Sequence, residues 1–225
     1  MTQQMTVADA QSLARRATLR RLVAALINEK LVSCTVLDAV SGSVIVAPPS
    51  CADGSSPAFS FAFSVVPEAV LAGSRTIEFI DQEDIASWSV SVKTPAARAG
   101  DMSMPSALFL LVAPHLSPPP SDDVAASIAA ELDSSVRNQE LAYLSPREPL
   151  SISSPAIDWE RAVVEGHPTH PMHRTRIGLT KEETLEWAAE MRRTVGIKFV
   201  TMPRADMAIH GDFERCATLA LSPRH

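Results

Sequence analysis

Residues 166–178 read GHPTHPMHRTRIG and carry three histidines and two arginines between two glycines. Pro168 and Pro171 fix the backbone φ angle and disfavour a helix at the residues before them. The histidines therefore cannot stack along one helix face as a series of metal ligands would. We interpret this stretch, called the histidine loop below, as an extended or turning segment that presents hydrogen-bond donors to anionic oxygen.

Two arginines in the loop are separated by a single residue. In an extended backbone, Arg174 and Arg176 would point the same way. Guanidinium groups bind phosphate oxygens in pairs, so these two side chains could hold two oxygens of a phosphate chain. Thr175, between them, could add a hydroxyl group from another direction.

The rest of the loop adds donors and backbone freedom. His167 and His170 can donate hydrogen bonds in either charge state. Gly166 and Gly178 would let the backbone come close to a ligand. Glu165, just before the loop, is placed to orient a histidine or to pair with an arginine.

Other interpretations of the loop stay open. A zinc site has the right residue type, but the loop lacks the usual ligand spacing and a nearby cysteine. A histidine-rich surface loop without a role is a second alternative, since each of these residue types is commonly exposed. Serine–histidine nucleophilic catalysis is not supported, because the chain has no GxSxG elbow.

Composition excludes several classes of protein. With 46% apolar and 20% charged residues, the 225-residue chain is typical of a soluble globular protein. Its net charge of -6 argues against nucleic-acid binding. No signal peptide is recognisable, and the apolar run 107–113 is too short to span a membrane. Cys34, Cys51 and Cys216 lack metal-ligand spacing, so we expect reduced thiols in a cytoplasmic protein.

The first half of the chain predicts a helix followed by a sheet. Apolar residues recur with helical spacing over residues 7–32, with Leu19, Leu22, Val23, Leu26 and Ile27 as the buried side. Four arginines fall largely on the other side, where we expect solvated charge: Arg15, Arg16, Arg20 and Arg21. Alternating runs at 35–40, 43–47, 59–66, 76–80 and 88–93 predict an antiparallel sheet with one wet face. Phe59, Phe61 and Phe63 are expected in its core.

The second half predicts two helices and two strands around the loop. A helix over 122–144 would be capped by Ser121 or Asp122. Thr180 and Glu183 form a capping box that opens a helix to about residue 194, with Leu185, Ala188 and Met191 as its buried side. Residues 196–203 and 205–214 look like strands. The fold class is therefore α+β, with an N-terminal subdomain over 1–113 and a second over 122–225.

Together these segments carry a resemblance. EGHPTHPMHRTRIG at 165–178 resembles the signature of the NRPS-independent siderophore synthetases, the aerobactin-synthetase-like IucA/IucC family. Three flanking segments are similar to family segments in the same order: LRRLVAALINEKLV at 19–32, AAELDSSVRNQELAY at 129–143 and IKFVTMPRADMAIHGDFE at 197–214. The resemblance implies the N-terminal part of that family's cupped-hand fold.

The resemblance also implies an activity. Family members use ATP to adenylate a carboxylate, commonly of citrate, and an amine or alcohol then displaces AMP. Their signature loop contacts the nucleotide phosphates. This implies that four residues bind phosphate here, namely His170, Arg174, Thr175 and Arg176, with His167, Gly166 and Gly178 shaping the loop. It makes ATP and Mg²⁺ the expected cofactors, and a citrate-like polycarboxylate and an amine the expected substrates.

This chain departs from the family in two ways. Family members usually carry lysine at the position of Arg174 and an aromatic residue at that of Leu179. They are also more than twice as long, and their second half supplies the magnesium ligands and the carboxylate site, so we expect no metal site and no assignable catalytic residue in this chain. Partners would then include a missing C-terminal half or a second copy. A catalytically inactive nucleotide-binding, regulatory or dimerisation domain is the alternative.

Overall fold

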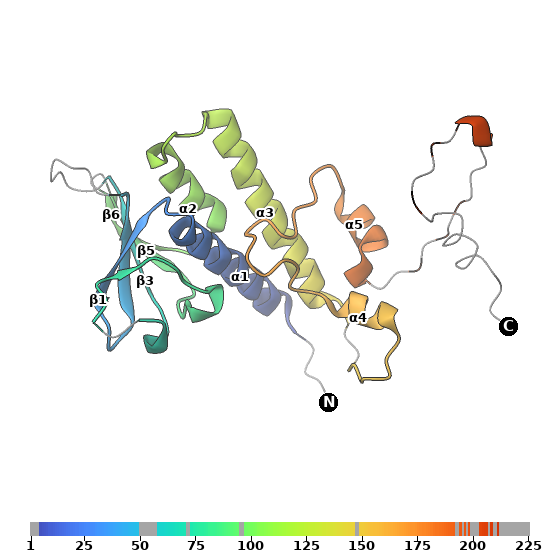
Figure 1. Ribbon diagram of the computed structural model, residues 1–225, viewed down its shortest axis with the longest axis horizontal. Helices are drawn as coiled ribbons and strands as arrows, with labels where there is room; N and C mark the ends of the chain where they lie inside the picture. Colours follow the sequence, from blue (N-terminus) through green and yellow to red (C-terminus); the bar gives the residue numbers. More distant parts are fainter. Residues whose placement is uncertain are drawn as a thin grey trace. The chain divides into compact units, whose positions relative to one another are not determined.

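The computed structural model of the chain (Figure 1) describes residues 5–49, 58–70, 73–94, 97–146 and 149–191, and beyond them Thr194, Gly196, Lys198, Pro203–Asp206, Ala208 and Gly211. The chain forms two compact units, Met1–Arg193 and Thr194–His225. The boundary predicted between residues 113 and 122 falls inside the first unit, where helices from both sides of it pack against each other.

The described elements combine helices with one antiparallel sheet, so the predicted α+β class is confirmed. The α-helices are α1 (Val7–Asn28), α2 (Pro105–Val112), α3 (Asp122–Leu144), α4 (Ala156–Ala162) and α5 (Lys181–Trp187). The strands are β1 (Ser33–Asp38), β2 (Ser43–Ala47), β3 (Ser60–Ser64), β4 (Thr76–Ile77), β5 (Val90–Thr94) and β6 (Ala97–Met102). Short 3-10 helices are η1 (Pro67–Ala69), η2 (Gln82–Asp84), η3 (Ala113–His115), η4 (Ala189–Met191) and η5 (Arg204–Asp206).

The sheet has the strand order β4-β1-β2-β3-β5-β6, with every pairing antiparallel. Buried and less buried residues alternate along β2 and β5, as expected for a sheet with one face on the core. Phe59, Phe61 and Phe63 are buried, which confirms their predicted core position. The β1–β2 turn needs Gly42, because its φ is +65° and an added Cβ would lie 2.0 Å from the Val65 carbonyl oxygen.

Helix α1 covers the core face of the sheet, and α2 and α3 pack beside it (Figure 1). The five apolar residues predicted for its buried side are all buried. Thr6 caps the helix by accepting from the Asp9 N–H group. The helix ends at Asn28, four residues before the predicted end, because Lys30 takes a positive φ of 58° and the chain turns into β1.

Helix α3 has the predicted bounds, and Ser121 caps it by accepting from the Val124 N–H group. Its apolar residues Leu132 and Val136 are buried, whereas Val124 is exposed in the first turn. Figure 1 shows the C-terminal end of α3 near α4 and α5. The histidine loop therefore runs beside the second half of this long helix, as the hydrogen bonds described below confirm.

Three expectations about elements were wrong or incomplete. The capping box of α5 is confirmed, but the helix ends at Trp187 instead of about residue 194, since Ala188 is extended. Of its predicted buried side, Ala188 is buried and Leu185 is partly buried. The sequence did not predict α2 or β6. The apolar run at 107–113 lies mostly in α2, and the sequence of β6 has no alternating pattern. Helix α4, which precedes the histidine loop, had not been assigned either.

The strands predicted at 196–203 and 205–214 lie mostly outside the described residues. Among the residues described there, Arg204–Asp206 form the 3-10 helix η5 and not a strand. Among the described residues, no helix has the length and apolar character needed to cross a membrane. Cys34 is a free, buried thiol, while Cys51 and Cys216 lie outside the described residues.

Candidate functional site

Helix α3 holds the backbone of the histidine loop with polar side chains. Ser134 Oγ accepts from the Arg176 N–H group at 3.1 Å, and Ser135 Oγ accepts from the Arg174 N–H group at 3.2 Å. The Asn138 side-chain amide donates to the Arg174 carbonyl oxygen at 3.0 Å. All three α3 side chains are buried. They satisfy backbone groups that an irregular segment would otherwise leave without partners.

Arg21 of α1 holds the start of the loop. Its Nε atom donates to the Pro168 carbonyl oxygen at 3.1 Å, and its Nη2 atom lies 3.1 Å from Glu165 Oε2. Tyr143 of α3 donates to the other carboxylate oxygen, Glu165 Oε1, at 2.7 Å. The expectation that Glu165 pairs with an arginine is therefore confirmed. Arg21 itself is only 3% exposed, so the prediction that it is a solvated surface charge was wrong, because the loop covers this face of α1.

Arg174 is buried, with 8% of its surface exposed, and its guanidinium group binds partners within the protein. Its Nη1 atom donates to Glu190 Oε1 at 2.8 Å, and its Nη2 atom donates to the Val163 carbonyl oxygen. Burial lowers the pKa of the guanidinium, and the charge of Glu190 acts in the opposite direction. In this arrangement Arg174 fixes the shape of the loop, and its predicted contact with phosphate stays a prediction.

Arg176 points to the same carboxylate. Its Nη2 atom donates to Glu190 Oε1 at 2.6 Å, while its side chain keeps 26% of its surface exposed. The two arginines therefore do converge on one oxygen, although that oxygen belongs to the protein. Thr175 turns away, and its hydroxyl group donates to the Glu131 carbonyl oxygen of α3 at 2.8 Å.

His167 and His170 are exposed at the loop's surface. The Met172 N–H group donates to His170 Nδ1 at 3.1 Å, so the proton of a neutral His170 ring is on Nε2. His167 Nδ1 similarly accepts from the Thr169 N–H group at 3.4 Å. The two ring centroids lie 6.4 Å apart. Both histidines thus keep an Nε2–H donor that is not used by these backbone contacts.

His173 has a different place. Its ring is largely buried, with Nε2 2.7 Å from Gln139 Oε1 and Nδ1 3.1 Å from the His170 carbonyl oxygen. Its pKa is lowered to about 4, first by burial and then by the charges of Arg21 and Arg174. His173 is therefore neutral at pH 7 and packs the loop against α3.

Gly166 is required by this packing. Its φ is +67°, and an added Cβ would lie 2.6 Å from His173 Cδ2 and 3.2 Å from Arg174 Nε. The sequence had suggested that this glycine lets the backbone approach a ligand. The structure shows that it lets the backbone approach the loop's own side chains. Gly178 has a φ of +88° with open space beside it.

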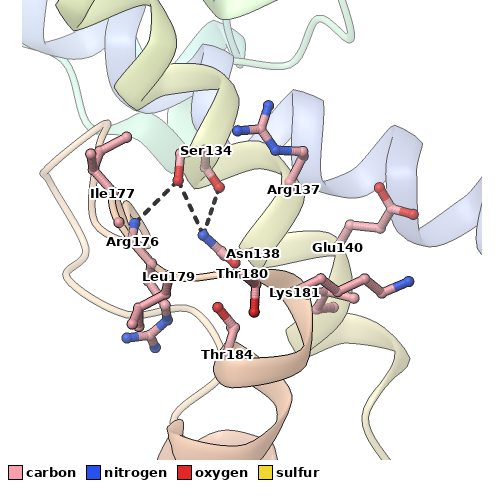
Figure 2. A pocket seen from close by; sticks show the side chains of 12 residues that line it. Ser134, Arg137, Asn138, Glu140, Arg176, Ile177, Leu179, Thr180, Lys181 and Thr184 are labelled. Atoms are coloured by element: carbon pink, nitrogen blue, oxygen red, sulfur yellow. Dashed lines mark hydrogen bonds between the residues drawn. The ribbon is translucent and has the colours of Figure 1, made fainter.

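A pocket of about 340 Å³ lies between α3, the end of the histidine loop and the start of α5. Figure 2 shows Ser134 and Asn138 of α3 facing the segment that begins at Arg176, and Arg137 and Glu140 of the same helix also line the pocket. Its other lining residues are Leu141, Ile177, Gly178, Leu179, Thr180, Lys181 and Thr184. Three cationic side chains and one carboxylate, that of Glu140, are among the lining residues, and the volume of the pocket is within the range of small-molecule sites.

The described residues contain no group of three or more His, Cys, Asp or Glu side chains that could hold a metal ion. The zinc alternative therefore has no support in the part of the chain that the structure covers. The expectation that magnesium ligands lie outside this chain stays a prediction.

Reasoning from the sequence missed several residues that build the site. They are Arg21, Glu190 and the α3 side chains Ser134, Ser135, Asn138 and Gln139. A signal for part of this set was present. Ser135 and Gln139 lie three and seven residues after the buried Leu132, on the face that helical spacing assigns to the core. Polar side chains at core positions indicate buried polar partners.

Comparisons with known proteins agree with the resemblance described above. Residues 155–221 match the model of the IucA / IucC family. The NRPS-independent siderophore synthetase rfs of Rhizopus delemar is 33% identical over 87 residues, which is 39% of this chain and 14% of that protein. The NRPS-independent siderophore synthetase-like protein ankE of Aspergillus thermomutatus is 38% identical over 92 residues, 39% of this chain and 15% of that protein.

The fold is similar to that of a solved synthetase. ATP-bound aerobactin synthetase IucA from Klebsiella pneumoniae has a TM-score of 0.54 and 13% identity, with 80% of this chain and 29% of that chain covered. The match thus spans about a seventh of the length of the two curated relatives and less than a third of the solved chain.

Proposed function

Because this chain resembles the IucA / IucC family in fold and, over residues 155–221, in sequence, we propose that it supplies a phosphate-binding part of an NRPS-independent siderophore synthetase. The complete reaction would activate a citrate-like carboxylate with ATP and condense it with an amine or an alcohol. The single observation that carries the proposal is that the matched segment contains the whole histidine loop.

The loop's geometry supports a role in binding phosphate. His167 and His170 present outward Nε2–H donors whose tautomers are set by backbone N–H groups. Arg176 adds a partly exposed cation at the wall of the pocket. A polyphosphate needs such donors and cations, because its charge is spread over several oxygens.

These side chains would act on the adenylation step. A carboxylate oxygen attacks the α-phosphorus of ATP, the bond to the bridging oxygen breaks, and pyrophosphate leaves with the electron pair. Donors from His170 and Arg176 beside the α-phosphate would stabilise the charge that develops. The amine then attacks the acyl carbon, and AMP leaves. Mg²⁺, if bound by residues beyond those described, would neutralise phosphate charge.

Arg174 contributes differently in this proposal. Its guanidinium is already occupied by Glu190 and the Val163 carbonyl oxygen, so it holds the loop that carries His170 and Arg176. Glu190 also neutralises part of the charge of Arg176. Phosphate binding therefore has to compete with one carboxylate for the Arg176 Nη2 atom.

The test is calorimetric titration of the purified 225-residue chain with Mg-ATP. Arg176→Ala and His170→Ala should each weaken binding by about tenfold, the effect of losing one charge-assisted hydrogen bond. Arg15→Ala is the matched control, since Arg15 lies on α1 away from the loop and has no ion-pair or hydrogen-bond partner among the described residues. Equal effects of the three substitutions would remove the histidine loop from the phosphate site.

A second assay separates binding from catalysis. Citrate-dependent release of pyrophosphate, with hydroxylamine as a generic nucleophile, would show that the chain performs adenylation. ATP binding that depends on Arg176, without citrate-dependent release, would support the nucleotide-binding or regulatory domain named above as the alternative.

A further inference from the structure

A second pocket is lined by Arg21 and shares no lining residue with the one in Figure 2. It has a volume of about 190 Å³. Three successive cationic residues of α1 line it, Arg16, Arg20 and Arg21. Gln82 and Glu83 of η2, and Tyr143 with Glu165, line the remaining walls. The arginines predicted as a solvated face are therefore gathered around a small cavity.

Each arginine has only part of its hydrogen-bonding capacity used. Arg16 donates from Nη2 to the Ala86 carbonyl oxygen at 3.1 Å, and its guanidinium carbon lies 4.1 Å from the Trp88 ring centroid. Arg20 donates to the Glu83 carbonyl oxygen and lies 3.6 Å from Glu83 Oε2. Three buried donors have no acceptor among the described residues: Arg16 Nε, Arg20 Nε and Arg21 Nη1.

The pocket also has an excess of positive charge. Its three guanidinium groups face two carboxylates, of Glu83 and Glu165. Within the described part of the chain, Arg16 has no carboxylate at ion-pair distance. Burial lowers the pKa of Arg20, the charge of Glu83 raises it, and the charges of Arg16 and Arg21 lower it. Closely placed cations that outnumber their carboxylate partners are stabilised by an anion that accepts hydrogen bonds from more than one of them.

We propose that this arginine pocket binds a small oxyanion, with phosphate or carboxylate oxygens, at a site separate from the histidine loop. The volume is below the usual range for nucleotide-sized ligands, which favours an ion the size of phosphate or a short carboxylic acid. The anion would take its hydrogen bonds from Arg16 and Arg20, which face the pocket from one side of α1.

The site would be linked to the loop through Arg21. This side chain lines the arginine pocket and also donates to the Pro168 carbonyl oxygen and to Glu165. An anion beside Arg21 would change the charge balance of its pair with Glu165. Because coupling between two sites is reciprocal, anion binding here and ligand binding at the histidine loop would affect each other equally.

The experiment measures the thermal unfolding midpoint of the full chain in the absence of ATP, with sodium phosphate, sodium citrate or sodium chloride of equal ionic strength. Phosphate or citrate should raise the midpoint of the wild-type chain, and chloride should not. Arg16→Gln and Arg20→Gln should each weaken the fitted affinity by about tenfold or more. Arg15→Gln, on the same helix, should keep it.

Further comparisons distinguish a phosphate from a carboxylate ligand, and the arginine pocket from the histidine loop. A response to phosphate alone assigns a phosphate ligand, and a response to citrate alone assigns a carboxylate. In Arg176→Ala the response should still be weakened by adding Arg16→Gln, so a failure of nucleotide binding at the histidine loop can be told apart from a failure of the arginine pocket. No response in the wild-type chain, an equal response to chloride, or a response lost in Arg176→Ala but kept in Arg16→Gln would overturn the proposal. Circular dichroism of each variant identifies any that fails to fold. If Arg20→Gln fails to fold, the anion affinity of Arg16→Gln is sufficient to test the proposal.

Discussion

Glu190 is the side chain whose replacement should cost the first unit most in stability. It is 5% exposed, and its Oε1 atom accepts from Arg174 at 2.8 Å and from Arg176 at 2.6 Å. Glu190→Gln keeps the side chain's size and an acceptor oxygen but removes the charge. Two guanidinium groups would then share a buried region without a counter-ion, and arginine does not lose its proton to relieve this.

The expected loss follows from the burial of the two partners. Removing one member of a buried ion pair costs about 3–5 kcal/mol. Arg174 is buried, so its pair with Glu190 belongs to this class, while Arg176 is 26% exposed and its pair is partly screened by water. Because glutamine keeps one acceptor, we expect the lower end, a loss of about 3 kcal/mol in the free energy of unfolding.

The assay is equilibrium unfolding in urea. The free energy of unfolding should fall with urea concentration at the same slope in the wild-type chain and in Glu190→Gln, so that the difference in midpoint reports the difference in free energy. Glu186→Gln is the matched control, since Glu186 is exposed on α5 and should change the free energy by less than about 0.5 kcal/mol. If Glu190→Gln were as mild as Glu186→Gln, the arginines would not depend on Glu190, and our account of how the loop is held would be wrong.

Three further outcomes follow from the same region and from the core. Gly166→Ala should destabilise the chain by about 2 kcal/mol in urea unfolding, because φ is +67° and the new Cβ meets the His173 ring; a neutral result would contradict the loop's packing. The pKa of His173 is about 4 in the folded chain and 6.5 in the unfolded chain, so between these pH values only the unfolded chain binds the proton. Stability should therefore rise from about pH 4 to pH 6.5, with a flatter profile in His173→Gln. Burial raises the pKa of Cys34 to about 12, so mass spectrometry after alkylation at pH 8 should find Cys34 unmodified in the folded chain and modified in urea.

The parts of the fold that sequence predicted well are those decided by local patterns. The α1 core positions, the three phenylalanines of β3 and its approach, and the Ser121 and Thr180 caps all follow from spacing over a few residues. The end of α5 does not follow from local spacing. Its helical pattern continues past Trp187, but Ala188 is extended, and Glu190 in the following turn is bound to Arg174 and Arg176. Those partners lie 14 and 16 residues earlier, so a local pattern could not show them.

The sequence predicted the histidine loop as a candidate site, but the contacts of its residues could not be predicted. Residue type and proline spacing identified the loop, but they assigned Arg174 and Arg176 equally to an anion. Which of them keeps donors for a ligand depends on burial, and burial depends on α1 and α3, which are distant in sequence. Burial also decided the role of Arg21. Helical spacing predicts it on the solvent side of α1, but in the structure the histidine loop covers it.

The histidine loop combines a rigid base with an accessible tip. Arg21 holds its start, Ser134, Ser135 and Asn138 hold its backbone, and Glu190 holds its two arginines. These contacts are internal and use buried groups, so they fix the loop before any ligand is present. The side chains left at the surface are His167, His170 and part of Arg176. A loop fixed in this way loses little conformational entropy when it binds an anion, and its few exposed donors can then give specific binding.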